Sequence, residues 1–453
     1  MLKLALLLIG AGDLGRNWRW LLALGLLVTL SGGVILIDTT DHITLLTLEG
    51  FGWGLVIKGL LQITFGALSH WGAGFLLYAL TGLVSVITGL LIVDFPMQVD
   101  FLASTLFGAA FLINGLFQCA AAWVIRFPGW KMAGLSGLEH LALGAVIAYG
   151  GWQDDQHWVI PLLLSLGAIL WGLSMITTAL RLRWIDRSPL SSVPSLLALP
   201  QLWSGLLNHR LERFREQLRS GNLDTIVKDI ARQADDPAAS HLTLYIWTPT
   251  DSADAGTAEG PPVIRRYIAA VDAKGTISTG HSALFMPPDI YLSLYPRDDF
   301  HPADTFLDDL RSHDVEGYFF SSYDAEVASW MPANVTLQFQ RIKPNQLRWF
   351  WALFQRDCSY NLTNRNCSVA VALALDVALA GSLGGRNTLW TLVRLMTSRS
   401  LWIAALVRRQ AEEMVWTPGL LLDYSLAIHR LVEESAHDPL FSLADQPQPD
   451  SPA

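Results

Sequence analysis

Two residues in the C-terminal half of the chain have the side-chain types and local settings that nucleophilic catalysis requires. Cys367 follows Asn366 and opens an apolar run, NCSVAVALALDVALAG, which predicts a buried helix with an asparagine N-cap. The partial positive charge at a helix N-terminus favours the thiolate of such a cysteine. His281 lies in a strand-like run, TGHSALFM. A thiol and an imidazole within hydrogen-bond reach can attack the carbonyl carbon of an amide or an ester.

The pattern around these two residues predicts a scaffold that mixes strands and helices. Short β-type runs alternate with loops rich in Gly, Asp and Pro, and the two runs on either side of Asp289 predict a hairpin. A helix is expected over 346–356, before the apolar helix that begins near Asn366. The expected strands are 241–249, 265–273, 276–288, 290–296 and 335–344.

The order of the two motifs along the chain is informative, because the histidine precedes the cysteine by 86 residues. A strand histidine followed later by a helix that opens with an Asn-Cys pair resembles the circularly permuted papain-like superfamily. That superfamily includes permuted NlpC-type peptidases and lecithin:retinol acyltransferase-like enzymes. The resemblance covers about residues 240–385 and implies an α+β thiol hydrolase or acyltransferase with Cys367 as nucleophile and His281 as base. The matching residues are Gly280, His281, Leu284, Asn366 and Cys367.

The resemblance also implies a third polar group, on the strand after the histidine, that orients the imidazole. The equivalent strand here offers Ser293, which departs from the His, Asn, Asp or Glu of such families. Tyr360 or a backbone N–H near Cys367 is a candidate donor to the oxyanion. Further polar residues follow the strand at Asp298, Asp299 and His301.

Less specific interpretations stay open for the same residues. A cysteine at a helix start is often a small buried residue, and a strand histidine is often hydrogen bonded locally. Cys358 is the less favoured nucleophile because it precedes the Asn-Cys pair, and a Cys358–Cys367 disulfide is an alternative. The chain has no CxxC or Cys/His metal spacing, so neither a metal nor a cofactor is predicted.

The N-terminal part of the chain is far more apolar than the rest. Only 16% of the 453 residues are charged, whereas soluble domains carry about 25%. Residues 1–18 are interpreted as a cytoplasmic or interfacial lead-in, since Asp13 and Arg16 interrupt their short apolar core. A membrane-spanning helix needs about 20 mostly apolar residues. Six stretches qualify: 20–37, 43–68, 74–93, 101–125, 135–150 and 159–180.

The charged residues between these stretches separate by sign. Lys and Arg are retained in the cytoplasm during insertion, so the basic side is expected to be cytoplasmic. Both ends of the bundle, and the domain that follows, are then cytoplasmic, where thiols stay reduced. The basic side has Arg16, Arg19, Arg126, Lys131, Arg181, Arg183 and Arg187, and the acidic side has Asp38, Asp41, Asp94, Asp100, Asp154 and Asp155.

Glycines in the apolar stretches recur with an offset of 56 positions, as the strings IKGLLQ and INGLFQ show, and a weaker third copy follows. The repeat predicts three helical hairpins in tandem, whose glycine faces allow close packing or oligomerisation. With the acidic, proline-containing turn IVDFPMQVD, residues 18–185 resemble the HdeD family of acid-resistance membrane proteins. The resemblance implies a bacterial inner-membrane protein linked to acid or protein-quality stress.

Four ionisable residues fall within the apolar stretches: Glu49, Lys58, Glu139 and His140. Ionisable groups are costly in lipid, so one interpretation is a path for protons or ions. The other is that Glu49 and Lys58 lie near opposite ends of one long helix. The charge of Lys58 is not repeated in the other copies.

The remaining segments complete the expected organisation. Residues 386–440 are expected to be helices, packed on the α+β domain or lying on the membrane surface. The tail is expected to be disordered. The expected domains are a transmembrane domain at 1–187, a linker and amphipathic helix at 188–235, the α+β domain at 236–385, C-terminal helices at 386–440 and the tail at 441–453.

The expected fold is therefore a membrane all-α bundle of six transmembrane helices plus a cytoplasmic α+β, permuted papain-like domain. The expected function is a membrane-tethered cysteine peptidase, amidase or acyltransferase in envelope, acid or protein-quality stress. The alternatives are a non-catalytic HdeD-like scaffold or chaperone with an inactive papain-like module, and a small ion or proton transporter. The expected partners are the lipid bilayer and lipidated or membrane-protein substrates. The net charge of −9, without a basic stripe, argues against nucleic acid.

Overall fold

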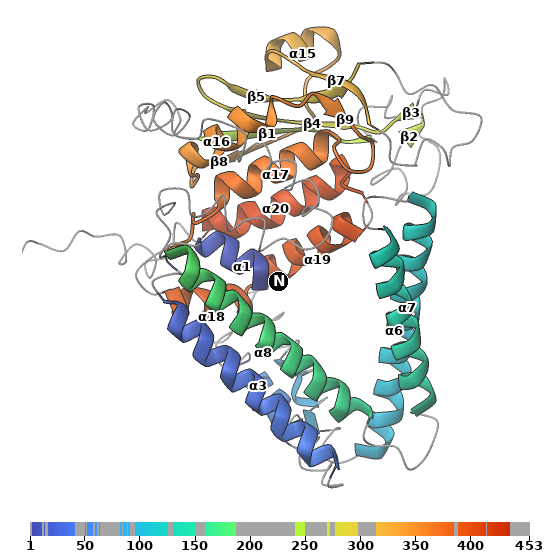
Figure 1. The fold of residues 1–453 in the computed structure, drawn as a ribbon. Helices are drawn as coiled ribbons and strands as arrows, with labels where there is room; N and C mark the ends of the chain where they lie inside the picture. Colours follow the sequence, from blue (N-terminus) through green and yellow to red (C-terminus); the bar gives the residue numbers. More distant parts are fainter. Residues whose placement is uncertain are drawn as a thin grey trace, which may run out of the picture. The chain divides into compact units, whose positions relative to one another are not determined.

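The computed structural model shows a chain rich in helices, with a few antiparallel sheets (Figure 1). It divides into two compact units. The mixed unit contains Met1–Trp18, Ala121–Lys131 and Arg181–Ala453, and the apolar unit contains Arg19–Ala120 and Met132–Leu180. The residues described are 2–10, 13, 17–40, scattered positions between 50 and 90, 96–125, 130–150, 159–186, 241–249, 270–271, 277–297, 314–384, 388–413 and 415–434.

A four-stranded antiparallel sheet forms the centre of the mixed unit, with strand order β5-β4-β1-β8. The hairpin predicted on either side of Asp289 is confirmed, since Met286 pairs with Ile290 across the turn. Successive side chains of β4 alternate between the two faces of the sheet. The strands are β1 Leu242–Trp247, β4 His281–Met286, β5 Ile290–Leu292 and β8 Val335–Phe339.

Two smaller sheets extend this core. A three-stranded sheet of order β6-β7-β9 begins where the chain leaves β5, and it carries Tyr295 and Tyr360 beside the central sheet. Its strands are β6 Leu294–Pro296, β7 Val315–Phe319 and β9 Ser359–Tyr360. A two-stranded ribbon pairs β2 Ala270–Val271 with β3 Ile277–Ser278.

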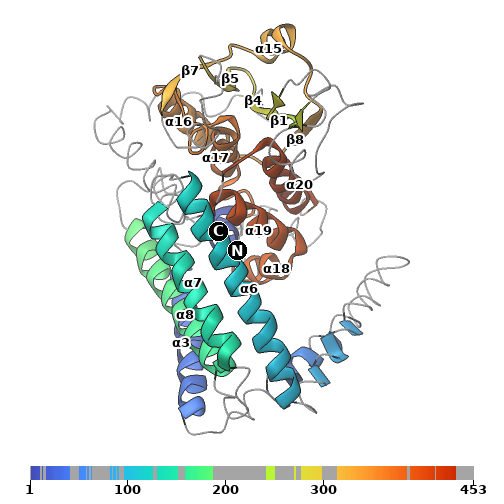
Figure 2. The same cartoon turned by 90° about the vertical axis from the view of Figure 1, so that its right-hand side faces the viewer.

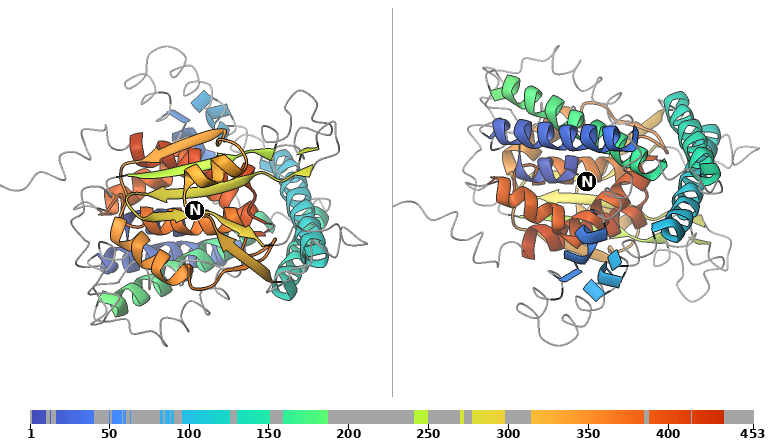
Figure 3. Two further views of the ribbon diagram at one scale, coloured as in Figure 1. Left: turned by 90° about the horizontal axis from the view of Figure 1, so that it is seen from above. Right: turned by 90° about the horizontal axis from the view of Figure 1, so that it is seen from below.

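Helices cover both faces of the central sheet (Figures 1 and 3). One face carries α16 Pro344–Phe354, α17 Cys367–Leu379 and α20 Pro418–Glu434, and the other carries the short α15 Tyr323–Ser329. Helix α17 is buried on nearly every side, as its apolar sequence predicts. Its one charged residue, Asp376, is satisfied by Arg408 at 2.7 Å and by the hydroxyl of Tyr424.

A further layer lies beyond α17 and α20 and includes the N-terminal helix. It comprises α1 Leu2–Ile9, α18 Thr388–Thr397 and α19 Arg399–Glu413. Leu4 to Ile9 are all buried, and the N–H groups of Gly381 and Leu383 donate to the carbonyls of Leu7 and Leu8 at 2.9 Å. Residues 2–9 are therefore part of the core of the mixed unit and not an interfacial segment, one of the two settings expected for them, because their apolar side chains are buried against other helices.

Among the described residues, long helices occupy four of the six expected stretches, and the scattered described positions of the other two stretches, such as 52–57 and 85–87, are helical as well. The four long helices are α3 Trp18–Thr40, α6 Pro96–Ile125, α7 Trp130–Gly150 and α8 Val159–Asp186. The stretches at 43–68 and 74–93 lie mostly outside the described residues. Within the described residues, Trp18–Ile37 and Thr105–Trp123 are long and apolar enough to cross a membrane, and only 17% and 28% of these windows are buried.

Glycines bring the helices of the apolar unit into close contact. A Cβ placed on Gly172 would lie 2.7 Å from the carbonyl oxygen of Gly25, and one on Gly115 would lie 2.8 Å from that of Gly137. Gly59 approaches Gly82 in the same way, at 2.5 Å. These contacts join the first stretch to the sixth, the fourth to the fifth and the second to the third. Among the described residues, these glycine contacts link the expected hairpins to one another rather than closing each hairpin on itself.

Two of the four ionisable residues expected within the apolar stretches are described. The Nδ1 atom of His140 lies 2.7 Å from the carbonyl oxygen of Ser136, and its ring stacks on Phe111. Glu139 is exposed on α7. Glu49 and Lys58 lie outside the described residues, as do the connector at 188–235 and the tail at 441–453.

The contact between the N-terminal helix and the rest of the mixed unit gives a first testable prediction. Gly10 has a φ of +88°, and a Cβ there would lie 2.7 Å from the Cα of Gly381. We expect Gly10→Ala to lower the free energy of unfolding of the mixed unit by about 1–3 kcal/mol, measured from its thermal midpoint in detergent. Gly33→Ala is the matched control, because nothing lies within 4 Å of its added Cβ. Equal effects of the two changes would contradict the tight contact at Gly10.

Candidate functional site

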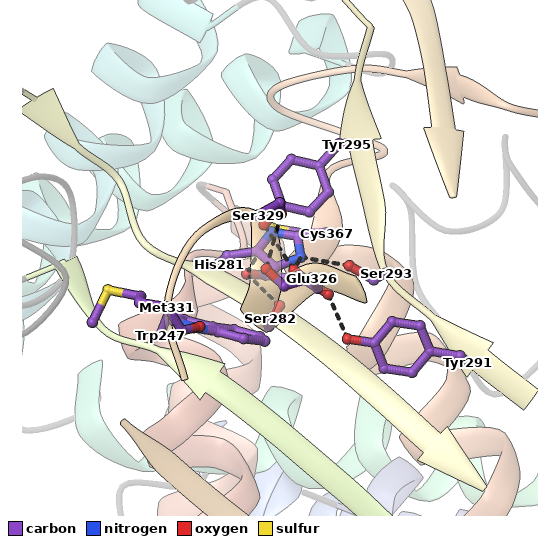
Figure 4. Close-up of polar contacts among 11 residues, drawn as sticks. Trp247, His281, Ser282, Tyr291, Ser293, Tyr295, Glu326, Ser329, Met331 and Cys367 are labelled. Atoms are coloured by element: carbon purple, nitrogen blue, oxygen red, sulfur yellow. Dashed lines mark hydrogen bonds and ion pairs between the residues drawn. The ribbon is translucent and has the colours of Figure 1, made fainter. Parts of the chain in front are cut away.

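His281 begins β4 and is buried on the face of the sheet that α15 covers. Its Nε2 atom lies 2.9 Å from Oγ of Ser293 and 3.2 Å from Oε1 of Glu326 (Figure 4). The ring of Tyr295 stacks on the imidazole with centroids 4.0 Å apart. Ser293 is thus hydrogen bonded to the imidazole that it was expected to orient.

Glu326, on α15, is a member of this cluster that the sequence analysis did not identify. Its side chain has no exposed surface. Tyr291 donates to its Oε2 atom, and Tyr295 donates to its Oε1 atom at 2.8 Å. The signal in the sequence that could have pointed to this cluster is the alternation of Tyr291, Ser293 and Tyr295. It places three hydroxyl groups at every second position of a strand, and therefore on one face.

The partners of His281 determine which ring nitrogen carries hydrogen. A carboxylate can only accept, so we assign the hydrogen to Nε2 and a lone pair to Nδ1. Among the described residues, Nδ1 of His281 has no hydrogen-bond partner. Burial lowers the pKa of His281 from 6.5 to about 3, so the ring is neutral near pH 7 and Nδ1 carries no hydrogen.

Asn366 caps the helix that carries the thiol, which confirms the N-cap prediction. Its backbone is extended, with φ −88° and ψ 177°, and its Oδ1 atom accepts the N–H of Val369 at 2.8 Å. The amide group of Asn366 donates to the carbonyls of Leu362 and Trp416 at 2.8 and 2.9 Å. These hydrogen bonds use the side chain of Asn366 to position the first turn of α17, which carries Cys367.

Cys367 is a free, buried thiol in the first turn of α17. Burial raises its pKa, while hydrogen bonds from the hydroxyl and backbone N–H groups of Ser368 and Ser282 lower it by less. The expectation that the helix N-terminus yields a resting thiolate is therefore wrong, because removing water from the sulfur outweighs the nearby donors. The same donors are in place to stabilise a negative charge on the sulfur when one forms.

Adjacent residues of β4 face the surroundings of the thiol and those of the imidazole. Ser282 faces α17, with its Oγ atom 3.3 Å from that of Ser368, whereas His281 faces Glu326. Within the part of the chain that the structure describes, Cys367 and His281 are not hydrogen bonded to each other. Tyr295 stacks on the ring of His281, and its pKa is raised by burial and by Glu326, with a smaller contribution from the charge of a Cys367 thiolate.

The other expected site residues have varied settings. Tyr360 is buried on β9, and burial, with a further contribution from Cys367, raises its pKa well above the usual value, so its hydroxyl stays a donor. Cys358 is exposed and free, and it forms no disulfide with Cys367. Asp298, Asp299 and His301 lie outside the described residues. No cluster of three or more His, Cys, Asp or Glu suited to a metal ion occurs among the residues described.

No protein-family model, curated protein or solved structure matches this chain. The resemblances to the HdeD family and to the permuted papain-like superfamily therefore stay predictions. Any proposal of thiol chemistry at Cys367 and His281 rests on the geometry of the site.

The buried, neutral imidazole predicts how stability depends on pH. The unfolded chain binds a proton at His281 below pH 6.5, whereas the folded site does so only near pH 3, so the free energy of unfolding falls as the pH drops through this window. The loss is at most about 1.4 kcal/mol per pH unit. We expect His281→Gln, whose amide can still donate to Glu326, to remove this part of the slope in denaturant titrations. Identical slopes for the two proteins would contradict a neutral imidazole.

Proposed function

We propose that the chain is a membrane-tethered thiol hydrolase or acyltransferase with Cys367 as nucleophile and His281 as base. The observation that carries this proposal is the buried imidazole itself. Its Nε2 atom is held by Ser293 and Glu326, which leaves the Nδ1 lone pair for a proton. The substrates would contain an amide or ester bond, and the setting would be envelope, acid or protein-quality stress.

In the proposed reaction, the sulfur of Cys367 attacks the carbonyl carbon as its proton passes to Nδ1 of His281. The tetrahedral intermediate then expels an amine or an alcohol, which takes the proton from the imidazolium, and a thioester remains on Cys367. Water or another acceptor attacks that thioester and restores the thiol. Catalytic hydrogen bonds are often long or poorly aligned before substrate binds, so the absence of a Cys367–His281 bond is compatible with this route.

The surroundings supply charge stabilisation where the reaction needs it. Positive charge forms on His281 beside the carboxylate of Glu326, and negative charge on the sulfur forms against the donors of Ser282 and Ser368. The oxyanion can be met by the protonated hydroxyl of Tyr360 or by the backbone N–H of Cys367, since the first N–H groups of a helix have no intrahelical acceptor. Because thiol and imidazole are both neutral at rest, proton transfer accompanies attack rather than preceding it.

The membrane setting of the proposal is a bacterial inner membrane crossed by a six-helix bundle, with both ends cytoplasmic. Low burial of α3 and α6 supports lipid contact, because the core helix of a soluble protein would be mostly buried. Six of the seven basic residues of the expected cytoplasmic side fall in Met1–Trp18, Ala121–Lys131 and Arg181–Ala453, which belong to the mixed unit, and Arg19 is the first residue of the apolar unit. A site held near lipid favours lipid esters, lipidated proteins or membrane proteins as substrates.

One observation favours a second candidate function. Cys367 and His281 are both buried, and their hydrogen bonds go to other residues. This arrangement also suits a stress scaffold or chaperone whose papain-like module has lost its activity.

Acyl transfer to the thiol separates the two functions. With a p-nitrophenyl ester, we expect a burst of nitrophenolate of about one equivalent as the thioester forms. Cys367→Ala should abolish the burst, and His281→Ala should slow it by about 10² to 10⁴-fold. Cys358→Ala is the matched control and should leave the burst intact, because the exposed thiol of Cys358 has no part in the proposed reaction. A burst that survives in Cys367→Ala, or no burst in the unmodified chain, would favour the inactive module.

The charge of Glu326 gives a separate prediction. Glu326→Gln keeps the shape of the side chain but removes the charge beside the developing imidazolium, so the acylation rate should fall by at least about 10²-fold. Tyr295→Phe removes one donor to the carboxylate and keeps its charge, so its effect should be smaller. Stopped-flow measurement of the burst across pH tests this, with thermal midpoints to verify folding. A Gln variant as fast as the unmodified chain would rule out this role for Glu326.

A further inference from the structure

The helices α18 and α19 expose large apolar side chains on the surface of the mixed unit. Trp390 is 60% exposed, Trp402 is 52% exposed and Leu406 is 67% exposed, and Val393 and Ile403 accompany them. The opposite sides of both helices are well buried, at positions such as Leu392, Leu395, Leu401 and Ala404. The two helices are thus packed normally on one side and apolar on the other, which marks an interaction surface.

The exposed residues follow helical spacing and so form two continuous stripes. Trp390 and Val393 are one turn apart on α18, and Trp402 and Leu406 are one turn apart on α19. The indole N–H of Trp402 donates to the carbonyl of Met396 at 2.8 Å, which fixes this side chain across the turn between the helices.

Positive charge accompanies these apolar stripes. Arg399 and Arg409 are exposed and Arg394 is half-buried, and α18 and α19 contain no acidic residue before Glu412. Trp and Leu beside Arg are the composition of helices that lie in a membrane interface, where the cations meet anionic headgroups.

Hydrogen bonding places the start of α18 beside the entry to the first apolar helix. Asn17, the residue before α3, donates to Oγ1 of Thr388, the first residue of α18, at 3.1 Å. The guanidinium of Arg183, near the end of α8, lies 4.9 Å from the ring centroid of Trp18. Helix α1, which leads to α3, packs against both α18 and α19. The residues that lead into α3 therefore lie against α18 within the mixed unit.

We infer that the exposed face of α18 and α19 binds an anionic lipid bilayer, with its arginines at the headgroups and its Trp and Leu side chains among the acyl chains. A second copy of the chain fits this face less well. A two-fold contact would oppose the same patch on both copies and bring like-charged arginines together. The inference rests on the membrane setting proposed above and is independent of the chemistry at Cys367.

The test uses the full chain in nanodiscs that hold one copy each, with the exposed Cys358 and the half-buried Cys119 replaced by Ser. A bimane label is placed at Leu406→Cys, and the matched control carries it at Ala328→Cys, an exposed position on α15 at the opposite side of the mixed unit (Figures 1 and 2). With doxyl-labelled lipids in discs that contain phosphatidylglycerol, we expect at least about twofold stronger quenching at position 406 than at position 328.

Two further measurements separate the possible outcomes. Arg399→Glu combined with Arg409→Glu should weaken lipid contact of the face by roughly fivefold per arginine, and discs of phosphatidylcholine alone should weaken it as well. Equal quenching at both positions, or shielding of position 406 only in discs with two copies, would overturn the inference. A chain that fails to enter discs would overturn the membrane setting and, with it, this inference. A chain without the nitrophenolate burst would overturn the proposed thiol chemistry and leave the quenching result unchanged.

Discussion

A carboxylate removed from water must be surrounded by donors, because an unpaired buried charge is very costly. Glu326 receives its donors from separate parts of the sheets: Tyr291 on β5, Tyr295 on β6 and the imidazole of His281 on β4. One short helix is thereby attached to three strands through a single side chain. The orientation of the imidazole, the stacking of Tyr295 and the position of α15 all depend on keeping this carboxylate satisfied.

The surroundings of Cys367 differ from those of Glu326, because they contain hydrogen-bond donors but no resting charge. The donors around Cys367 are arranged for a charge that is absent at rest, since burial keeps its proton in place. Neutral groups are less costly to bury than charged ones, so Cys367 and His281 can both lie in the interior at rest. Charge would then appear on the sulfur and the imidazole together, each beside groups of the right polarity, which is the arrangement that preorganised electrostatics requires.

Local patterns in the sequence were sufficient for several elements. The Asn366 cap, α17 and the hairpin of β4 and β5 follow from spacing and turn residues, and Ser293 was selected because it lies on the strand after His281. Glu326 was missed because a single glutamate in a seven-residue helix carries no periodic signal, and only tertiary contacts give it a role. The thiolate expectation failed for a related reason, because a helix N-terminus is visible in sequence whereas the degree of desolvation is not.

The burial of α1 has a consequence for the folding of the mixed unit. Leu7 accepts a hydrogen bond from Gly381, so residues that are more than 370 positions apart in the sequence pair in its core. Closing so long a stretch of chain is costly in entropy, and contacts of such long sequence separation slow folding. Docking of α1 against Gly381 and Leu383 is therefore expected to be one of the slow steps in folding this unit.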